Sequence, residues 1–398
     1  MSNELASVYL KKGQDRRLNQ GHLWVYSNEI DTQKTSLKSF TAGEQVIVHS
    51  QTGKPLGIAY INPHSLISAR FISRNTSVLL DRSLFVHRIK IALSLRERLF
   101  AKPYYRLIFG ESDLLPGVVV DRFNDILVVQ ITTAGVEQQR EALIEALEKV
   151  LKPRVILLRN DVKMRELEGL ELYNEVIVGN LSGLTTIEEN DTLFQVDIQK
   201  GQKTGWFYDH RMNRARVQQY AQGKRVLDLF SYVGAWGLAA AKAGASEVFC
   251  VDASEQALDW LDASAAMNDF NNITSIQGNV FDVLKHLRNE REKFDIVIVD
   301  PPAFIKRKKD YKEGLNAYRR VNQMAMQLCT RDAILVSASC SHHLPAETLV
   351  QQIQGAARHL DRFAQILEQG HQSPDHPIHP ALPETAYIKS FLSRVTPT

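Results

Sequence analysis

Residues 226–252 read VLDLFSYVGAWGLAAAKAGASEVFCVD, and this stretch decides the fold. The apolar run at 226–230 is typical of a buried strand in a parallel sheet. The alanine-rich segment at 238–243 favours a helix, because alanine has the highest intrinsic helix propensity. A second apolar run at 247–251 predicts the next strand. The stretch therefore predicts a strand, a turn, a helix and a neighbouring strand.

The ends of these two strands hold the first candidate ligand residues. In an open parallel sheet, ligands bind beyond the carboxyl ends of the strands, where Asp252 is placed to accept hydrogen bonds from ribose hydroxyls. Gly234 and Gly237 bracket a turn that a ligand could approach closely. The turn does not match G-x-G-x-x-G, but its D-x-F-x-x-x-G-x-x-G pattern from Asp228 resembles motif I of S-adenosylmethionine (SAM) methyltransferases. A strand–helix–strand unit without a ligand is the alternative at this point.

Strands and helices continue to alternate from residue 191 to the C-terminus. Such alternation predicts the α/β class, with a doubly wound parallel sheet covered by helices on both faces. The predicted strands lie at 226–230, 247–251, 273–277, 295–299 and 333–338, and the predicted helices at 208–221, 235–243, 254–268 and 313–330.

Two smaller domains are expected before this one. Residues 1–74 contain short strand-like runs separated by Gly, Pro and Asn, which predict a small β-barrel. The basic start at 11–17 and the segment 21–27 resemble the PUA domain, a small barrel found in RNA-modifying enzymes. Residues 75–190 are expected to form a middle α/β domain. It has a helix at 81–101 and then the order strand, strand, helix, strand and strand.

Composition sets further bounds. The 398 residues are 44% hydrophobic and 23% charged, as in globular proteins. No apolar run approaches the ~20 residues of a membrane span, and the polar N-terminus has no apolar signal segment, so a cytosolic protein without membrane contact is expected. The net charge of +3 permits nucleic-acid binding without proving it. Three cysteines are too few for a disulfide framework and match no zinc pattern, so no metal is expected.

The loop after the fourth predicted strand reads DPPAF and begins at Asp300. Its two prolines fix the backbone, and the loop resembles motif IV of methyltransferases that act on bases. Phe304 is placed to stack on an extracted base, and Lys306, Arg307 and Lys308 are placed to hold phosphates. The alternatives are a strand with a stiff turn and a solvated basic surface.

Cys340 follows the last predicted strand and is expected to face Asp300. Cys250 and Cys329, in a predicted strand and a predicted helix, are interpreted as core residues. Addition of a thiolate to carbon-6 of cytosine makes carbon-5 nucleophilic, and this covalent catalysis requires a cysteine. Asp300 would hydrogen-bond or protonate ring nitrogen 3, and proton donation would require a raised pKa. The sequence does not identify the base that removes the carbon-5 proton.

Two further segments carry candidate cofactor ligands. Residues 199–211 are rich in polar and aromatic side chains, and Lys203 or Arg211 is placed to bind the carboxylate of a methionine moiety. The alternative is a basic loop in which Asp209 caps the following helix. Asn279 follows the third predicted strand, where an amide and a neighbouring N–H can recognise an adenine edge. The alternative there is a polar loop.

Along essentially the whole chain, these motifs resemble the family of bacterial 23S ribosomal RNA large subunit methyltransferase I. The most specific are G-x-K-T-G-x-x-x-D-x-R at 201–211, F-S-Y-x-G at 230–234, D-P-P-x-F, and S-C-S at 339–341. The resemblance implies a PUA domain, a middle domain and a Rossmann-like class I SAM-dependent domain that makes 5-methylcytosine, with Cys340 as the nucleophile. The implied SAM contacts are Gln199, Lys203, Thr204, Gly205, Phe207, Asp209, Arg211, Asp228, Phe230, Ser231, Gly234, Asp252, Asn279, Val280 and Asp300. The residues expected to contact RNA are Phe304, Lys306, Arg307, Lys308, Lys11 and Arg16.

The sequence departs from the family pattern at two places. Ala235 stands where relatives often have glycine, and Asn279 replaces the usual acid. The loop at 301–303 lacks the second cysteine seen in another group of cytosine methyltransferases, so product release cannot use a second thiol there. His376, in a family-like D-H-P segment, is interpreted as a solvated loop residue, and the alternative is a histidine that reaches the site.

The preferred interpretation is therefore a SAM-dependent enzyme that methylates carbon-5 of a cytosine in 23S ribosomal RNA or a large-subunit precursor. One alternative is a methyltransferase that modifies a nitrogen of guanine or adenine, which needs no Cys340. Another is a non-catalytic RNA-binding ribosome assembly factor. The sequence does not decide the target nucleotide or the oligomeric state, for which a homodimer is one alternative.

Overall fold

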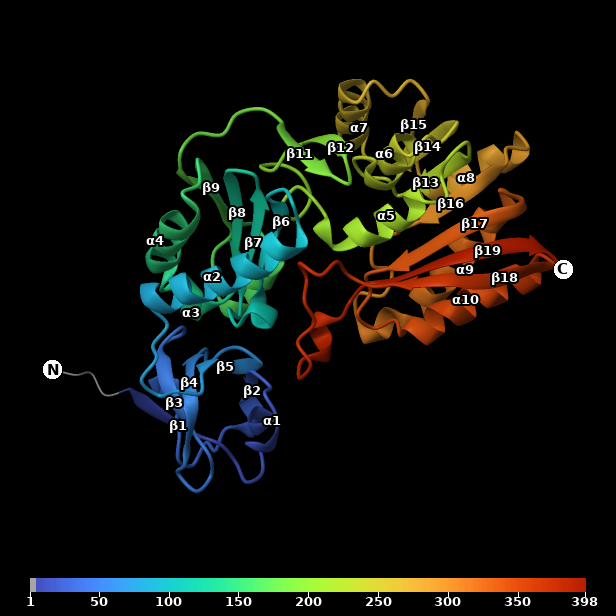
Figure 1. Ribbon diagram of the computed structural model, residues 1–398. Helices are drawn as coiled ribbons and strands as arrows, with labels where there is room; N and C mark the ends of the chain where they lie inside the picture. Colours follow the sequence, from blue (N-terminus) through green and yellow to red (C-terminus); the bar gives the residue numbers. More distant parts are fainter. Residues whose placement is uncertain (1–4) are drawn as a thin grey trace. The chain divides into compact units, whose positions relative to one another are not determined.

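The computed structural model describes residues 5–398, which form two compact units (Figure 1). The first unit runs to Gly183 and also includes Ile198–Trp206 and Pro374–Thr385. The predicted domain boundaries after residues 74 and 190 stay predictions. The second unit comprises Leu184–Asp197, Phe207–Ser373 and Ala386–Thr398.

The first unit begins with a five-stranded sheet in the order β1-β3-β4-β5-β2. Buried and partly exposed residues alternate along β3, as expected when one face of a strand packs on a core. The predicted strand-like runs correspond to β3, β4 and β5, whereas β1 and β2 were not predicted. The elements are β1 (Ala6–Tyr9), α1 (Arg16–Asn19), β2 (Trp24–Tyr26), β3 (Gln45–His49), β4 (Pro55–Ile61) and β5 (Ile67–Ser73).

A second five-stranded sheet of the same unit has the order β10-β9-β8-β7-β6, and β8 pairs in parallel with β9. Its core is shared with α2 and α4, which pack on each other. The helix predicted at 81–101 is confirmed as α2, and the predicted strands and helix correspond to β7, β8, α4, β9 and β10. Strand β6 was not predicted. The bounds are α2 (Arg82–Leu99), β6 (Tyr104–Phe109), β7 (Val118–Phe123), β8 (Ile126–Ile131), α3 (Ala134–Glu137), α4 (Arg140–Leu151), β9 (Val155–Asn160) and β10 (Tyr173–Val178).

The second unit opens with a hairpin of β11 (Thr185–Glu189) and β12 (Thr192–Val196). The two turn residues, Asn190 and Asp191, have φ values of 50° and 59°. Two successive residues with positive φ are typical of the type I′ turn, which favours Asn and Asp.

The second unit is built on a seven-stranded sheet in the order β15-β14-β13-β16-β17-β19-β18 (Figure 1). The five predicted strands pair in parallel, which confirms the predicted doubly wound sheet. Strand β19 is antiparallel to both β17 and β18. The strands are β13 (Arg225–Leu229), β14 (Glu247–Asp252), β15 (Ile273–Gln277), β16 (Phe294–Val299), β17 (Cys329–Ser339), β18 (Arg362–Gly370) and β19 (Lys389–Pro397).

Helices cover both faces of this sheet. Leu227 of β13 shares a core cluster with α8, α9 and α10, whereas the adjacent Val226 belongs to a cluster with α5, α6 and α7. Successive side chains of one strand therefore enter different cores, which is why the strands are apolar throughout. The helices are α5 (Arg211–Gln218), α6 (Ala235–Lys242), α7 (Glu255–Met267), α8 (Val280–Asn289), α9 (Tyr311–Gln327) and α10 (Ala346–His359).

Several details differ from the predictions. Helix α8 begins at Val280, where a polar loop was one interpretation, and it buries four apolar residues at helical spacing. Helix α10 and strands β18 and β19 were not predicted. Cys329 lies at the start of β17 rather than in a helix, although its predicted burial is confirmed.

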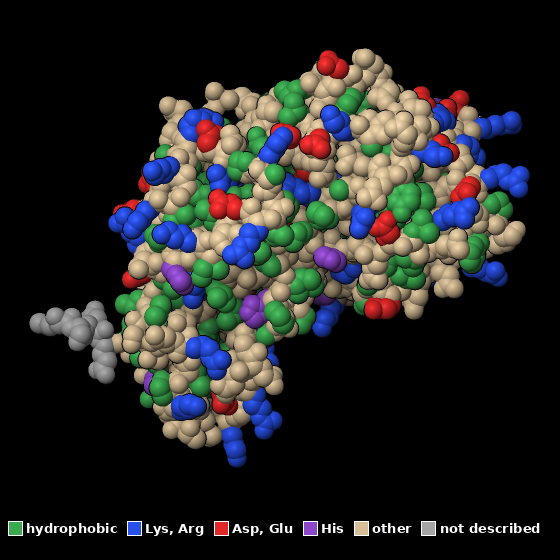
Figure 2. All heavy atoms as spheres, in the orientation of Figure 1, with side chains coloured by type: hydrophobic (Ala, Val, Ile, Leu, Met, Phe, Trp, Pro, Cys, Tyr) green, Lys and Arg blue, Asp and Glu red, His purple; other side chains and the backbone are tan. Residues whose placement is uncertain are grey.

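Surface properties set few limits on function. On the face drawn in Figure 2, Lys and Arg side chains are interspersed with Asp and Glu. Within residues 5–398, no helix is both long enough and apolar enough to cross a membrane. The same part of the chain contains no group of three His, Cys, Asp or Glu residues that could hold a metal ion.

Candidate active site

The turn between β13 and α6 holds buried polar atoms at the carboxyl edge of the sheet. Asp228 is fully buried, and its Oδ2 accepts a hydrogen bond of 2.9 Å from the backbone N–H of Gly237. Its Oδ1 and the hydroxyl of buried Ser231 have no partner among the described residues. Phe230 and Tyr232 have φ values of 61° and 51°. Such non-glycine strain concentrates at functional sites, so the turn is a candidate binding site.

Burial raises the pKa of Asp228 to about 8, and the nearby carboxylate of Asp300 acts in the same direction. The hydrogen bond from Gly237 opposes this shift. Gly237 itself lies within α6, where an added Cβ would meet the Sγ of Cys250 at 2.4 Å. Close packing on β14, rather than the approach of a ligand, therefore requires a glycine at this position.

Asp252 ends β14 beside this turn. Its Oδ2 accepts from the backbone N–H of Tyr232 at 2.8 Å, and its Oδ1 accepts from that of Ser254 at 2.9 Å. These two hydrogen bonds orient the half-buried carboxylate of Asp252. Its remaining lone pairs are able to accept hydrogen bonds from ribose hydroxyls.

Asn279 follows β15 at the same edge and caps α8. Its Oδ1 accepts a hydrogen bond of 2.9 Å from the backbone N–H of Phe281. The side chain is exposed, and Val280 after it is buried. Asn is among the preferred N-cap residues. The asparagine that replaces the family's usual acid at position 279 therefore still caps α8.

Asp300 follows β16, which pairs with β13 on the side opposite β14. Its Oδ2 accepts from the indole N–H of Trp236 at 2.9 Å, and its Oδ1 lies 3.5 Å from Nε2 of His210. The Nδ1 of His210 lies 3.0 Å from the amide nitrogen of Asn213, which places the ring proton on Nε2, facing Asp300. Both carboxylate oxygens therefore face N–H groups, a geometry that suits a hydrogen-bond acceptor better than the proton donor considered from sequence.

Cys340 follows β17, which pairs with β16, so it lies at the same sheet edge as Asp300. Its side chain is half-buried, whereas Cys250 and Cys329 are buried, as predicted. Burial raises the pKa of Cys329 to about 12 and that of Cys250 above its ordinary value. Of the three thiols, Cys340 is therefore the one accessible for chemistry.

The two serines that flank Cys340 are held by one phenol. The hydroxyl of Tyr318 on α9 forms hydrogen bonds of 2.8 Å with Oγ of Ser339 and 2.9 Å with Oγ of Ser341. All three side chains are buried, and the Ser341 hydroxyl also accepts from the backbone N–H of Ile305 at 3.3 Å. This network ties the Cys340 segment to the loop that follows Asp300.

We expect Tyr318→Phe to lower the free energy of unfolding by about 1–2 kcal/mol, because it leaves buried hydroxyls short of a partner. Tyr311→Phe, on the same helix but with its side chain at the surface, serves as the matched control and is expected to change stability by less than about 0.5 kcal/mol. Urea denaturation of both variants measures the difference, and equal stabilities would contradict the structural role of the Tyr318 hydroxyl.

Phe304 is packed between two aromatic rings of the site. Its ring centroid lies 4.9 Å from that of Tyr318 and 6.2 Å from that of Phe230. The side chain remains half-buried, so its stacking on a base stays a prediction. Lys306, Arg307 and Lys308 follow it and are exposed, and Arg307 forms an ion pair with Asp310 at 3.1 Å. Their contacts with phosphates stay a prediction.

The segment 199–211 is divided between the two units. Gln199, Lys203, Thr204 and Gly205 belong to the first unit, where the Thr204 hydroxyl donates to buried Asp121 at 2.5 Å. Lys203 is exposed, with a φ of 51°, and Gly205 has a φ of 101°.

Phe207, Asp209 and Arg211 belong to the second unit. The Oδ2 of Asp209 accepts from the hydroxyl of Tyr387 at 2.7 Å. The residue at the N-cap of α5 is His210, so the alternative that Asp209 caps this helix is wrong. Arg211 forms an ion pair of 3.4 Å with buried Glu189. The negative charge of Glu189 therefore offsets the positive charge of Arg211, which was predicted to bind a cofactor carboxylate.

His376 does not lie in a solvated loop, so that interpretation is wrong. It is buried in the first unit, its Nδ1 lies 2.9 Å from Oδ1 of Asp375, and its ring packs on Phe109. Asp375 in turn accepts a hydrogen bond of 2.9 Å from the backbone N–H of Arg106. These contacts anchor the D-H-P segment to β6.

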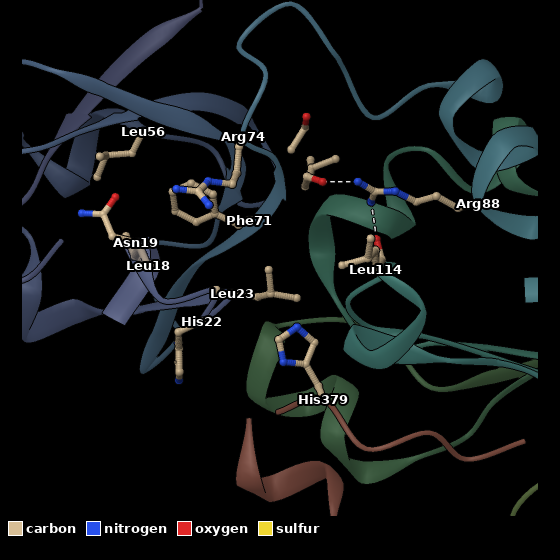
Figure 3. Close-up of a pocket in the computed structure, with 13 residues that line it drawn as sticks. Leu18, Asn19, His22, Leu23, Leu56, Phe71, Arg74, Arg88, Leu114 and His379 are labelled. Atoms are coloured by element: carbon tan, nitrogen blue, oxygen red, sulfur yellow. Dashed lines mark hydrogen bonds between the residues drawn. The ribbon is translucent and has the colours of Figure 1, made fainter. Parts of the chain in front are cut away.

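The first unit also contains a cavity of about 410 Å³ (Figure 3). Its lining is mainly apolar, with Leu23, Leu56 and Phe71 among the contributing side chains. Arg74 on the rim is exposed. The buried Arg88 donates to the carbonyl oxygens of Ile72 and Leu114, and burial lowers its pKa to about 10.

Comparisons with known proteins agree with this architecture. Residues 8–74 match the model of a PUA-like domain, and residues 169–391 match that of an S-adenosylmethionine-dependent methyltransferase. The chain is 37% identical to the ribosomal RNA large subunit methyltransferase I of Erwinia tasmaniensis, over 98% of this chain and 99% of that protein. Identity to the protein of the same name from Serratia proteamaculans is 36%, with the same coverage.

A solved structure shares the fold along nearly the whole chain. SMU.776, described as a methyltransferase and complexed with SAH, has a TM-score of 0.84 at 21% identity, covering 98% of this chain and 100% of that one. The recognition of the fold and of SAM as the cofactor, made from the sequence motifs, is thereby confirmed.

Proposed function

This chain belongs to the ribosomal RNA large subunit methyltransferase I family, and on that basis we propose that it methylates carbon-5 of a cytosine in 23S ribosomal RNA through a covalent adduct with Cys340. One observation supports this chemistry above the others. An accessible thiol follows β17 at the sheet edge where Asp300 follows β16. A nitrogen methyltransferase would need Asp300 but no thiol. A ribosomal substrate would place the enzyme in the cytoplasm.

The cofactor fits the residues at this edge. The unpartnered Oδ1 of Asp228 and hydroxyl of Ser231 are buried polar atoms suited to hydrogen bonds with the polar methionine end of SAM. Asp252 would hold the ribose, and Asn279 with the N–H of Val280 would contact the adenine. When bound, SAM supplies an activated methyl group.

The chain's own residues would prepare the cytosine. The thiolate of Cys340 adds to carbon-6 and breaks the double bond between carbon-5 and carbon-6. The electron pair of that bond is delocalised toward ring nitrogen 3, which leaves an enamine that is nucleophilic at carbon-5. Asp300, fixed by Trp236 and His210, would accept a hydrogen bond from the exocyclic amino group of cytosine, which is a donor. After methylation, the carbon-5 proton leaves to a base, and the Cys340 sulfur is eliminated from carbon-6.

Trapping of the adduct tests this proposal. A fluorine at carbon-5 cannot leave as a cation, so an RNA transcript that contains 5-fluorocytidine should remain covalently attached to the methylating enzyme. We expect a complex that survives denaturing electrophoresis and a cross-linked peptide that contains Cys340. The absence of such a complex, with normal methylation of the unmodified transcript, would contradict the covalent mechanism.

We further propose that RNA binds to the PUA-like part and to the basic loop after Phe304. Lys11 and Arg16 are exposed in the first unit, and the apolar cavity with Arg74 on its rim offers a surface for an unpaired base. In the second unit, Lys306 and Lys308 are exposed beside the candidate site. Mixed cations and apolar surface suit single-stranded RNA.

The double variant Lys306→Gln, Lys308→Gln is expected to weaken binding to a 23S transcript and to reduce its salt dependence. Each lost phosphate contact should lower the slope of log K against log salt by about one. Lys242→Gln is the matched control, because the exposed Lys242 ends α6 at the opposite edge of the sheet. Equal slopes for the double variant and the control would exclude phosphate contacts by these two lysines.

A further inference from the structure

We propose that Lys389 is a positioning residue for Cys340: its ammonium group fixes the backbone after the cysteine and stabilises the thiolate form of the cysteine side chain. The inference deepens the proposed function, because a thiolate is the nucleophile in that chemistry. It assigns to the first residue of β19 a role that no sequence motif indicated.

The sheet register places Lys389 beside the cysteine. Strand β19 runs antiparallel to β17, and Lys389 pairs with Ser339, the residue before Cys340. The Nζ of Lys389 donates to the carbonyl oxygen of Ser341, the residue after Cys340, at 2.7 Å, and to that of Tyr387 at 3.1 Å. The lysine is therefore tied to both neighbours of the cysteine.

The two side chains also interact through their charges. Burial lowers the pKa of Lys389, and the negative charge of a Cys340 thiolate opposes that shift. The interaction is mutual, so the ammonium favours the thiolate to the same extent. Two carbonyl acceptors that face the Nζ further favour its protonated form. On ionisation the thiol proton passes to water, and Lys389 keeps its own proton.

Other titratable groups face this site from the neighbouring elements. Asp300 follows β16, and its negative charge opposes a thiolate. Burial raises the pKa of Tyr318 on α9, which keeps its phenol neutral. His342 lies two residues after the cysteine, and its ring centroid lies 5.8 Å from that of Tyr387. Asp300 and Tyr318 supply no positive charge, so the groups here that favour a thiolate are the Lys389 ammonium, which donates to two carbonyl oxygens, and His342 when its ring is protonated.

The test is the pH profile of Cys340 alkylation by iodoacetamide in the full-length protein, with the modified peptide identified by mass spectrometry. We expect the wild-type thiol to titrate below the ordinary value for cysteine, about 8.5. Lys389→Met should raise the midpoint by about one unit, and alkylation near pH 7 should slow by up to about tenfold. Lys389→Arg should restore the wild-type profile, because it keeps the positive charge.

Two further variants separate charge from structure. Lys389→Gln keeps a donor for the carbonyl of Ser341 without the charge, so it should behave like Lys389→Met even if the methionine variant folds poorly. Lys242→Met, a remote exposed position, should leave the profile unchanged. Wild-type titration at or above the ordinary value, or a wild-type profile in Lys389→Gln, would overturn the proposal. Since no RNA is present, this result is independent of whether cytosine is the substrate.

Discussion

Cys340→Ser is expected to lower the rate of RNA methylation by at least about a thousandfold, because serine cannot supply a thiolate and the loss of a covalent nucleophile removes the main route through the reaction. The affinity for SAM should change by less than about twofold, since Cys340 is not among the proposed cofactor ligands. Single-turnover methylation of a 23S transcript, with calorimetry of SAM binding, measures both effects.

Cys329→Ser is the matched control for this substitution. Cys329 is buried at the other end of the same strand, where its Sγ lies 3.7 Å from the carbonyl oxygen of Ala325, an acceptor that a serine hydroxyl retains. The control should therefore keep most of the wild-type rate. Near-normal methylation by Cys340→Ser would remove the covalent mechanism and would favour a nitrogen as the methylated atom.

Asp228→Asn is expected to make the protein more stable than the wild type at alkaline pH. Because burial raises the pKa of Asp228 to about 8, the folded protein holds a proton between about pH 4 and pH 8 that the unfolded chain has released. The free energy of unfolding of the wild type therefore falls as the pH rises through this range. Asparagine resembles the protonated acid but does not titrate, so the free energy of unfolding of Asp228→Asn should not fall in this way.

The stability difference between the two proteins should grow by about 4 kcal/mol between pH 5 and pH 9. Urea denaturation at several pH values measures it, and Asp259→Asn, at an exposed position of α7, should show no such trend. A difference between Asp228→Asn and wild type that does not depend on pH would show that Asp228 is ionised in the folded protein at all of these pH values.

The central part of the site was predictable from sequence for a geometric reason. Parallel strands bring their carboxyl ends to one edge, so Asp228, Asp252, Asp300 and Cys340 could be placed together once the strands were recognised. The pairing of β13 with β14 and β16, and of β16 with β17, confirms that placement.

The side chains that orient these groups could not be predicted in this way. Trp236 reaches Asp300 across 64 residues of sequence, and an apolar residue in a helix is typical of a core. His210 lies inside a recognised motif, but its contact with Asp300 depends on the packing of α5. Tyr318 and Lys389 come from elements without a motif, and β19 was not predicted at all. Their contacts are tertiary, which local patterns do not encode.

Buried polar segments were also misjudged. The D-H-P segment around His376 has the Pro-rich, polar composition of a loop. Its burial follows from specific partners, such as the bond between Asp375 and the backbone of Arg106, which satisfy polar groups away from water. The apolar residues of α8 recur at helical spacing in the sequence. The helix was not predicted, because the polar residues at its start were interpreted as a loop.

The most direct measurement is the 5-methylcytosine content of 23S ribosomal RNA, by nucleoside mass spectrometry and fragment mapping, in cells that lack this protein. We predict the loss of one 5-methylcytosine, restored by the wild-type protein and by Cys329→Ser but not by Cys340→Ser. An unchanged 5-methylcytosine content together with a missing methylpurine would contradict the account and would leave Cys340 as a packing residue.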